Sequence, residues 1–309
     1  MKYITEAESS AVITHDLAFA AMSEALAAAC QADAHIFPAV IAHGSDPGNR
    51  FSLKSAADRE VAGVKIGFNW PLNTTKGIPS HNSVIIVFDQ EVGKIAAVIE
   101  AGVVNSYRTS AADAVATNLL ARKEARVLAV FGAGNQAWYE CQAIARVRAI
   151  DVVYVVNKFP DEAERFVQRL VAAGMKARVA EAREACENAD IIVTATPSRA
   201  PLFEAQWVRP GTHVSCIGAD SKGKQELPVE LLLGAELFCD LPQQSTGIGE
   251  FQHIAGQARD GLLQVTPIGQ VLTGAAKGRS SNQAITVFDT SGIALQDLYM
   301  GRRLLEALA

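Results

Sequence analysis

A short glycine-rich stretch in the middle of the chain carries the clearest chemical signal in the sequence. Val127–Phe131 is an apolar run of strand length, and Gly132, Gly134 and Ala137 follow it in a G-x-G-x-x-A pattern before a segment of helical spacing. In such a strand, turn and helix, backbone N–H groups approach a pyrophosphate, and the helix N-terminus supplies partial positive charge. The pattern predicts a dinucleotide site, the alternative being a packing turn in another kind of α/β protein.

Two lysines in the first third of the chain are candidates for binding an anion. Lys54 and Lys65 stand on the polar side of two segments that alternate with period two. If these segments pair as a hairpin with ends near Ser55 and Ala62, both ammonium groups fall on one face, and a slip of one residue would separate them. A lysine in such a position is often simply solvated.

Arg108 is a third candidate cation. It comes directly before the expected start of a helix at residue 109, where it opposes the helix dipole unless an anion is bound there too. Its planar guanidinium matches the geometry of a carboxylate. The alternative is a structural arginine that pairs with Asp113 or Glu100.

The residues after the second strand of the dinucleotide unit bear on the choice of cofactor. An acidic residue at this point would bond the adenosine ribose and repel a 2′-phosphate. Asn157, followed by Lys158, stands there instead. The sequence therefore permits NADP without excluding NAD.

Asp220 is the carboxylate best placed for proton transfer. It follows the expected strand 214–218, and in a doubly wound sheet the loops at the carboxyl ends of strands line the ligand crevice. Lys222, Lys224 and Glu226 follow closely, so the alternative is a charged surface loop. Neither His81 nor His253 has a metal-ligand partner at useful spacing, and no metal site is expected.

Periodicity divides the chain into two expected domains. The first holds a helix at 15–32 and the alternating segments 49–54, 63–69, 84–88 and 94–100, which indicates an α+β domain with a mostly antiparallel sheet. Strands are then expected at 127–131, 152–156, 176–179, 191–196, 214–218, 237–239 and 285–289, with helices at 109–122, 161–173, 181–188 and 296–308. This alternation predicts a Rossmann-type, doubly wound parallel sheet. The last helix is expected to return to the first domain, which gives boundaries of 1–115 with 290–309, and 116–289.

Composition excludes several classes of function. The 309 residues are 49% hydrophobic and 20% charged, which allows two domains with their own cores. A net charge of −5 gives no support to nucleic-acid or anionic-membrane binding, and no apolar run approaches the roughly 18 residues that span a bilayer. The five cysteines are scattered without a C-x-x-C pair, as in a cytoplasmic protein with reduced thiols.

Several of these motifs occur, in the same order, in a known family. The chain resembles the ornithine cyclodeaminase/μ-crystallin family of NAD(P)-dependent imine and amino-acid oxidoreductases over nearly its whole length. The matching segments are 63–65, 79–81, 108–111, 132–137, 209–213, 218–227 and 289–292.

The resemblance implies roles for individual residues. In the family, the residues matching Lys65 and Arg108 hold the substrate carboxylate, and the aspartate matching Asp220 handles the substrate nitrogen and its proton. Lys54 and His81 are further candidates for substrate binding, and Lys65 is also a catalytic candidate. The candidate cofactor contacts are Thr109, Gly132, Ala133, Gly134, Asn135, Gln136, Asn157, Lys158, Ala195, Thr196, Pro197, Gly218, Ser291 and Gly292. Family members dimerise through the substrate domain, and the apolar strands 84–88 and 94–100 fit such a homodimer.

The implied activity is reduction of a small α-imino acid to an L-amino acid by NAD(P)H, with iminosuccinate to L-aspartate as the preferred reaction. The alternatives are a lyase of the ornithine cyclodeaminase type, another imino- or amino-acid dehydrogenase of the alanine dehydrogenase or ketimine reductase type, and a non-enzymatic binding protein of the μ-crystallin type. Lys54 and Lys65 argue against the lyase, whose basic substrate needs an acidic pocket.

One departure from the family concerns the carboxylate clamp. Family members often carry an arginine shortly after the proline that matches Pro38, whereas an Ala-Val-Ile run follows it in this chain. Part of the clamp is therefore expected to come from Lys54 or Arg50.

Overall fold

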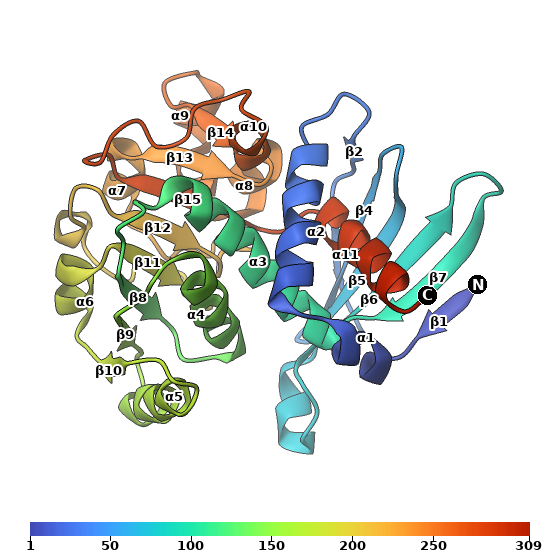
Figure 1. Cartoon of the computed structure of the whole chain (residues 1–309), viewed down its shortest axis with the longest axis horizontal. Coiled ribbons are helices and arrows are strands. Elements are labelled where there is room, and N and C mark those ends of the chain that lie inside the picture. Colours follow the sequence, from blue (N-terminus) through green and yellow to red (C-terminus); the bar gives the residue numbers. More distant parts are fainter. The chain divides into compact units, whose positions relative to one another are not determined.

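The computed structural model describes all 309 residues, which divide into two compact units (Figure 1). Unit 1 comprises Met1–Arg108 and Ile293–Ala309, and unit 2 comprises Thr109–Gly292. Helix α3 (Gly102–Leu120) begins in unit 1 and ends in unit 2. Taken singly, none of the helices combines the length and apolarity that crossing a membrane requires.

Unit 1 is built on a seven-stranded sheet with the order β1-β7-β6-β5-β4-β2, in which β3 also pairs with β4. All neighbours are antiparallel except β1 and β7, so the predicted, mostly antiparallel sheet is confirmed. The strands are β1 (Lys2–Ile4), β2 (His35–Ile36), β3 (Val40–His43), β4 (Arg50–Ala57), β5 (Ala62–Asn69), β6 (His81–Asp89) and β7 (Lys94–Glu100). A 3-10 helix, η1 (Pro71–Lys76), precedes β6.

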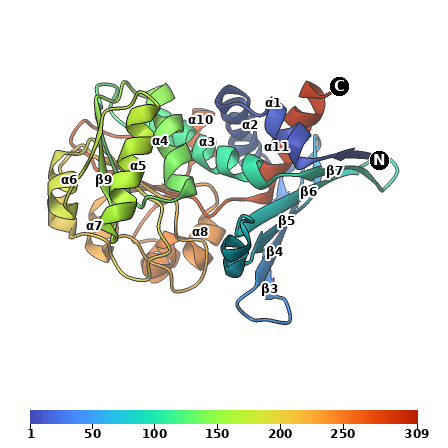
Figure 2. The same ribbon diagram turned by 90° about the horizontal axis from the view of Figure 1, so that it is seen from below.

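Three helices cover one face of this sheet: α1 (Glu6–Val12), α2 (His15–Ala28) and α11 (Ala294–Ala307) (Figure 2). In β6, Ser83, Ile85 and Val87 are buried on that face, while the residues between them are half-buried. Helix α11 lies close to β5 at Gly63, where a Cβ atom would come within 2.7 Å of the Leu298 side chain. The period of two is present as predicted, but the faces are reversed in β5: Val64, Ile66 and Phe68 lie on the more open face, whereas Lys65 lies on the buried face with Ile85.

The open face of the sheet is largely apolar. Its half-buried side chains include Val64, Ile66, Phe68, Val84, Ile86 and Val98. Phe88 and Ile95, which pair across β6 and β7, are exposed. The single layer of helices in unit 1 thus buries one side of the sheet and leaves apolar surface on the other.

Unit 2 contains an eight-stranded parallel sheet with the order β10-β9-β8-β11-β12-β15-β13-β14. The strands are β8 (Val127–Phe131), β9 (Val152–Val156), β10 (Ala177–Val179), β11 (Ile191–Thr194), β12 (His213–Cys216), β13 (Glu236–Cys239), β14 (Val265–Pro267) and β15 (Thr286–Asp289). The strand order reverses between β8 and β11, which is the point where ligands bind in open α/β sheets.

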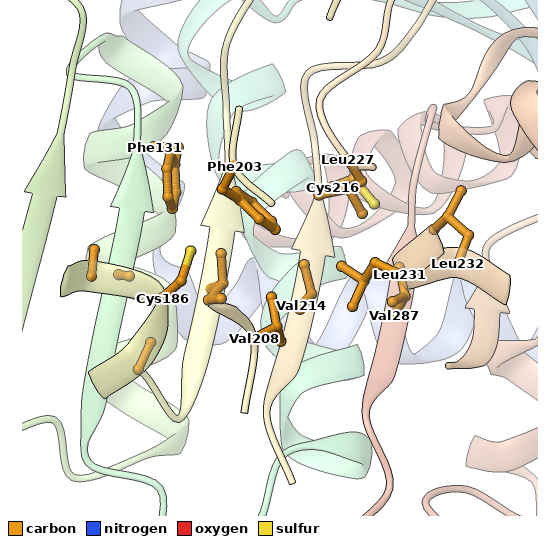
Figure 3. Close-up of a cluster of buried hydrophobic side chains, with 14 of the residues drawn as sticks. Phe131, Cys186, Phe203, Val208, Val214, Cys216, Leu227, Leu231, Leu232 and Val287 are labelled. Carbon is orange, nitrogen blue, oxygen red and sulfur yellow. The ribbon is translucent and has the colours of Figure 1, made fainter. Parts of the chain in front are cut away.

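Helices cover both faces of this sheet, as a doubly wound fold requires. They are α4 (Asn135–Val147), α5 (Pro160–Ala172), α6 (Ala182–Asn188), α7 (Val229–Gly234), α8 (Pro242–Ile248), α9 (Ala255–Arg259) and α10 (Ile268–Leu272), with 3-10 helices η2 (Ala205–Trp207) and η3 (Glu250–Ile254). The two faces of β8 enter two different cores: Leu128 packs with α4 and α5, whereas Phe131 belongs to the cluster drawn in Figure 3, with Phe203 and Val214. The predicted Rossmann-type sheet is confirmed.

The start of helix α3 differs from the prediction. The helix begins at Gly102 instead of residue 109, so Arg108 lies inside it, and the argument from the helix dipole does not apply. The cap comes from a distant side chain, because the carboxylate of Glu6 accepts hydrogen bonds from the backbone N–H groups of Gly102 and Val103, both at 2.8 Å. Thr109 and Ser110 are helical residues and not caps.

Candidate active site

Two buried cations of unit 1 meet at a single amide oxygen. Lys65 Nζ and Arg108 Nη2 both donate to Asn105 Oδ1, at 3.0 and 3.1 Å. Lys65 is 5% exposed and Arg108 7% exposed, so both charges lie largely away from bulk water. Two cations that converge on one point can share a carboxylate, so this pair is a candidate carboxylate site.

Two residues of helix α11 contact the guanidinium group of Arg108. Arg108 Nη1 donates to Gln296 Oε1 at 3.0 Å, and Arg108 Nε lies 3.6 Å from Asp297 Oδ1, an ion pair longer than a hydrogen bond. The arginine therefore pairs with Asp297, which the sequence did not single out, and not with Asp113 or Glu100. The guanidinium group is therefore held by α11 at Nη1 and Nε, and by Asn105 at Nη2.

Lys54 lies directly opposite Lys65 in the β4–β5 hairpin, so the predicted placement of both lysines on one face is confirmed. The hairpin closes between Ala57 and Ala62, which keeps this register although the first strand runs beyond Ser55. A Cβ atom at Gly67 would lie 3.4 Å from Lys65 Nζ. Glycine at this position thus leaves room for the ammonium group.

Further polar residues share this face beyond the rung of Ser52, Gly67 and Ser83. Arg50 pairs with Asn69, and Asn69 with His81, so these three side chains share the face of Lys54 and Lys65. All three are exposed, in contrast to Lys65. His81 therefore shares a face with Lys65 but stands four residues along the sheet from the pair of Lys65 and Ile85.

The glycine loop of unit 2 has the geometry that a dinucleotide needs. Gly132 has φ of 113°, a conformation that favours glycine, and a Cβ atom there would lie 2.7 Å from the carbonyl oxygen of Ala195. Nothing lies within 4 Å of a Cβ at Gly134. Helix α4 then begins at Asn135 with no side chain capping it, so its N-terminus fits a pyrophosphate.

Most other predicted cofactor residues follow the carboxyl ends of parallel strands and so lie along the same edge of the sheet. They are Ala133 after β8, Asn157 and Lys158 after β9, Ala195, Thr196 and Pro197 after β11, Gly218 after β12, and Ser291 and Gly292 after β15, with Asn135 and Gln136 at the start of α4. Thr109 is the exception, because it lies within helix α3. Asn157 Nδ2 donates to Glu162 Oε2 at 3.0 Å, and the Lys158 ammonium lies 5.8 Å from the Phe159 ring.

Asp220 lies on the loop after β12, as predicted. Lys224 Nζ donates to Asp220 Oδ1 at 2.6 Å and to the carbonyl oxygen of Gly218 at 3.0 Å. The Asp220 side chain is 58% exposed, whereas that of Lys224 is 22% exposed. The lysine thus ties a solvent-accessible carboxylate to the end of the strand.

Three buried carboxyl groups that the sequence did not identify lie at the same end of the sheet in unit 2. Burial raises the pKa of Glu226, Glu250 and Asp289, in the case of Glu250 to about 7. Hydrogen bonds act in the opposite direction: those from Thr194 and Thr196 lower the pKa of Glu226. No group of three or more His, Cys, Asp or Glu side chains is arranged to hold a metal ion.

Comparison with known proteins places the chain among related sequences of nearly equal length. The model of the ornithine cyclodeaminase/mu-crystallin family matches residues 1–308. The chain is 33% identical over 310 residues to the iminosuccinate reductase of Paracoccus denitrificans, covering 99% of this chain and 96% of that protein. The structure of that reductase in complex with NAD+ has a TM-score of 0.92 at 32% identity, covering 99% of this chain and 96% of that one.

Two further solved structures are similar over the same length. An archaeal alanine dehydrogenase dimer with bound NAD has a TM-score of 0.92 at 33% identity, covering 99% of this chain and 95% of that one. A Delta(1)-pyrroline-2-carboxylate reductase of Thermococcus litoralis, in complex with NADH and L-proline, has a TM-score of 0.91 at 26% identity, covering 99% and 97%.

Proposed function

The chain belongs to the ornithine cyclodeaminase/mu-crystallin family, and on that basis we propose that it uses a nicotinamide cofactor to reduce an α-imino acid to an L-amino acid. The observation that carries the proposal is the pair of buried cations, Lys65 and Arg108, on one oxygen of Asn105. The similar proteins named above support the reaction class, since they include reductases of imino acids and a dehydrogenase of an amino acid.

The charges of the cationic site favour a carboxylate. Lys65 and Arg108 are two cations, Asp297 is one carboxylate and Asn105 is neutral, so these four side chains carry an excess of one positive charge. One carboxylate of the substrate balances this excess, and the fork of Arg108 gives it a fixed orientation. We assign the α-carboxylate of the imino acid to this site.

The glycine loop and the loops after β9, β11, β12 and β15 hold the cofactor in this proposal. A nicotinamide cofactor held by these loops would supply the hydride that reduces the imine carbon, while the imine nitrogen takes up a proton. We assign the proton at nitrogen to Asp220, because an anion stabilises a protonated imine and a carboxyl group can relay a proton. NADP is also accepted in this proposal, since Asn157 carries no charge that would repel a 2′-phosphate.

We further propose iminosuccinate as the substrate and L-aspartate as the product. Lys54 beside Lys65 provides a further cation on the same face, and Arg50 stands further along that face. These cations suit the second carboxylate of iminosuccinate and disfavour the distal ammonium of a basic amino acid such as ornithine. They also compensate for the arginine that is absent after Pro38.

We also propose that the protein is a homodimer through the open face of the unit 1 sheet. The apolar side chains on that face, from Val64 to Val98, form a contiguous surface over three strands, which is typical of an interface. The archaeal alanine dehydrogenase of similar structure is a dimer. Light scattering at micromolar concentration should give twice the chain mass, and a monomer would contradict this assignment.

Oxidation of NADH and NADPH by a panel of 2-oxo acids, each with and without ammonia, tests the proposed activity. Oxaloacetate with ammonia forms iminosuccinate in solution and should give the highest kcat/KM. Pyruvate and a cyclic imino acid serve as comparison substrates. Oxidation of neither cofactor with any imine would refute the reaction class, whereas a preference for a monocarboxylic imine would refute only the substrate.

A further inference from the structure

Glu226 joins two loops of unit 2 through both oxygens of its carboxylate. Its Oε1 accepts from the backbone N–H and from the hydroxyl of Thr196, both at 2.7 Å. Its Oε2 accepts from the hydroxyl of Thr194 and from the backbone N–H of Gly218, both at 2.8 Å. The residue is completely buried. One side chain thus ties the loop after β11 to the loop after β12.

These four hydrogen bonds require a carboxyl group, because each of two oxygens must accept from a backbone N–H. Each oxygen receives one hydroxyl, which can rotate, and one backbone N–H, which cannot become an acceptor. An amide of the same shape would present its NH2 group to one of the two N–H groups, at Thr196 or at Gly218. A donor would then face a donor in a buried site, and one loop would lose its anchor.

The two loops that Glu226 joins are in backbone contact with each other and with the glycine loop. A Cβ atom at Gly218 would lie 2.1 Å from the carbonyl oxygen of Thr196, and one at Gly132 would lie 2.7 Å from that of Ala195. A shift of the β11 loop would therefore disturb the glycine loop on one side and the β12 loop on the other.

Glu226 also links the two ends of the segment 218–226, which carries Asp220. The segment begins at Gly218, whose N–H binds the carboxylate, and ends at Glu226 itself, while Lys224 ties Asp220 to Gly218 within it. The backbone N–H of Glu226 is held in turn by Glu250, at 3.0 and 3.1 Å to its two oxygens. Glu226 is thus itself held in place by a residue of η3.

We propose that Glu226 is the positioning residue for the nicotinamide end of the cofactor. It holds the β11 and β12 loops at the spacing that admits the ring, and it holds Asp220 against the same loops. This role rests on the proposed function, because that function assigns the two loops to the cofactor. The residue acts through Thr196 and Gly218 and has no chemical step of its own.

Glu226→Gln tests the proposal, with Glu230→Gln as the matched control, since Glu230 is an exposed glutamate of α7. In the protein without cofactor, hydrogen exchange should accelerate at the amides of Thr196 and Gly218 and stay unchanged in β9. The Kd for NADH, from fluorescence titration, should rise at least about tenfold, the loss of one buried charge-assisted hydrogen bond. The control should match the parent protein in both measurements.

The measurements separate positioning from mere stability. A purely structural role would lower the melting temperature but leave the NADH Kd of the folded protein within twofold of the parent, and that result would overturn the proposal. If Glu226→Gln does not fold, Thr194→Val decides, because it removes one hydroxyl donor and keeps the shape; its Kd should rise about threefold, and an unchanged Kd overturns the proposal. Failure of the parent chain to bind NADH would overturn the proposed cofactor, whereas unchanged binding in Glu226→Gln overturns the positioning role alone.

Discussion

Replacing Asn105 by aspartate tests how the cations of unit 1 recognise an anion. The amide oxygen of Asn105 lies 3.0 Å from Lys65 Nζ and 3.1 Å from Arg108 Nη2. In Asn105→Asp a carboxylate takes the place of this neutral group and cancels the excess positive charge of the site. We expect the substrate to bind more weakly, while the protein without substrate becomes more stable because an anion now lies between two buried cations.

The size of the effect follows from the repulsion between two carboxylates. A substrate carboxylate that contacts the same cations would lie about 6 Å from the new one, and at an effective dielectric constant of ~20 the two repel by about 3 kcal/mol. That energy corresponds to roughly a 100-fold rise in KM. Side-chain relaxation reduces the repulsion, so we expect a rise of about 10- to 100-fold.

The assay is NADH oxidation with increasing imino acid, together with thermal unfolding without substrate. Asn118→Asp is the control, because it places a carboxylate in the same helix, where the Asn118 side chain lies 3.1 Å from Arg148. KM should rise and the melting temperature should increase in Asn105→Asp, while KM stays at the parent value in the control. An unchanged or lower KM in Asn105→Asp would refute the assignment of the carboxylate to this site.

Four other substitutions test separate parts of the proposal. Gly134→Leu should fold, because nothing lies within 4 Å of a Cβ there, but should lose NADH binding in a fluorescence titration; intact binding would contradict the dinucleotide site. Asn157→Asp should shift the ratio of kcat/KM values toward NADH over NADPH by repelling the 2′-phosphate, and an unchanged ratio would place the ribose elsewhere. Asp220→Asn should keep NADH binding and lower kcat by roughly 100-fold, about 3 kcal/mol, and a near-normal kcat would exclude it as the proton donor. Burial raises the pKa of Glu250 to about 7 from 4.5, so the folded protein keeps a proton there that the unfolded chain has released, and stability should fall as the pH rises through this window. Glu250→Gln keeps an oxygen for both backbone N–H groups that Oε1 accepts and should make the fall smaller, as measured by urea unfolding below and above the window; a fall of the parent size would assign it to other groups, such as Glu226 or Asp289.

The parts of the fold that local patterns specify were predictable from the sequence. The apolar runs of β8 and β9, and the alternation of β7, match the predicted bounds at both ends. The start of α3 was not predictable, since its cap is the side chain of Glu6, which is 96 residues away. The short strands β1 to β3 and helices α7 to α10 were missed because they are too brief to show a period.

In the candidate site, too, the residues placed by a local pattern were predictable and those brought in by distant contacts were not. The pairing of Lys54 with Lys65 followed from the period of two, whereas Gln296 and Asp297 reach Arg108 through tertiary folding from the far end of the chain. Asn105 was not predicted, because the helix was expected to begin only at residue 109. Asn105 and Arg108 are three residues apart and share a helix face only if the helix includes both.

Glu226 shows a limit of composition as a guide to burial. Its neighbours Lys222 and Lys224 make the segment read as a charged surface loop, yet Glu226 is completely buried. Four donors, from the last residue of β11 and from the loops after β11 and β12, compensate the cost of burying it, and such a set of partners is not visible in a sequence.

The destination of the hydride tests the central claim most directly. The protein is incubated with oxaloacetate, ammonia and NADH that carries deuterium at both positions of nicotinamide C4, and the products are identified by mass spectrometry and NMR. Reduction of an α-imino acid predicts L-aspartate with one deuterium at the α-carbon, formed only when ammonia is present. Deuterium in a 2-hydroxy acid, or in no product at all, would contradict the account.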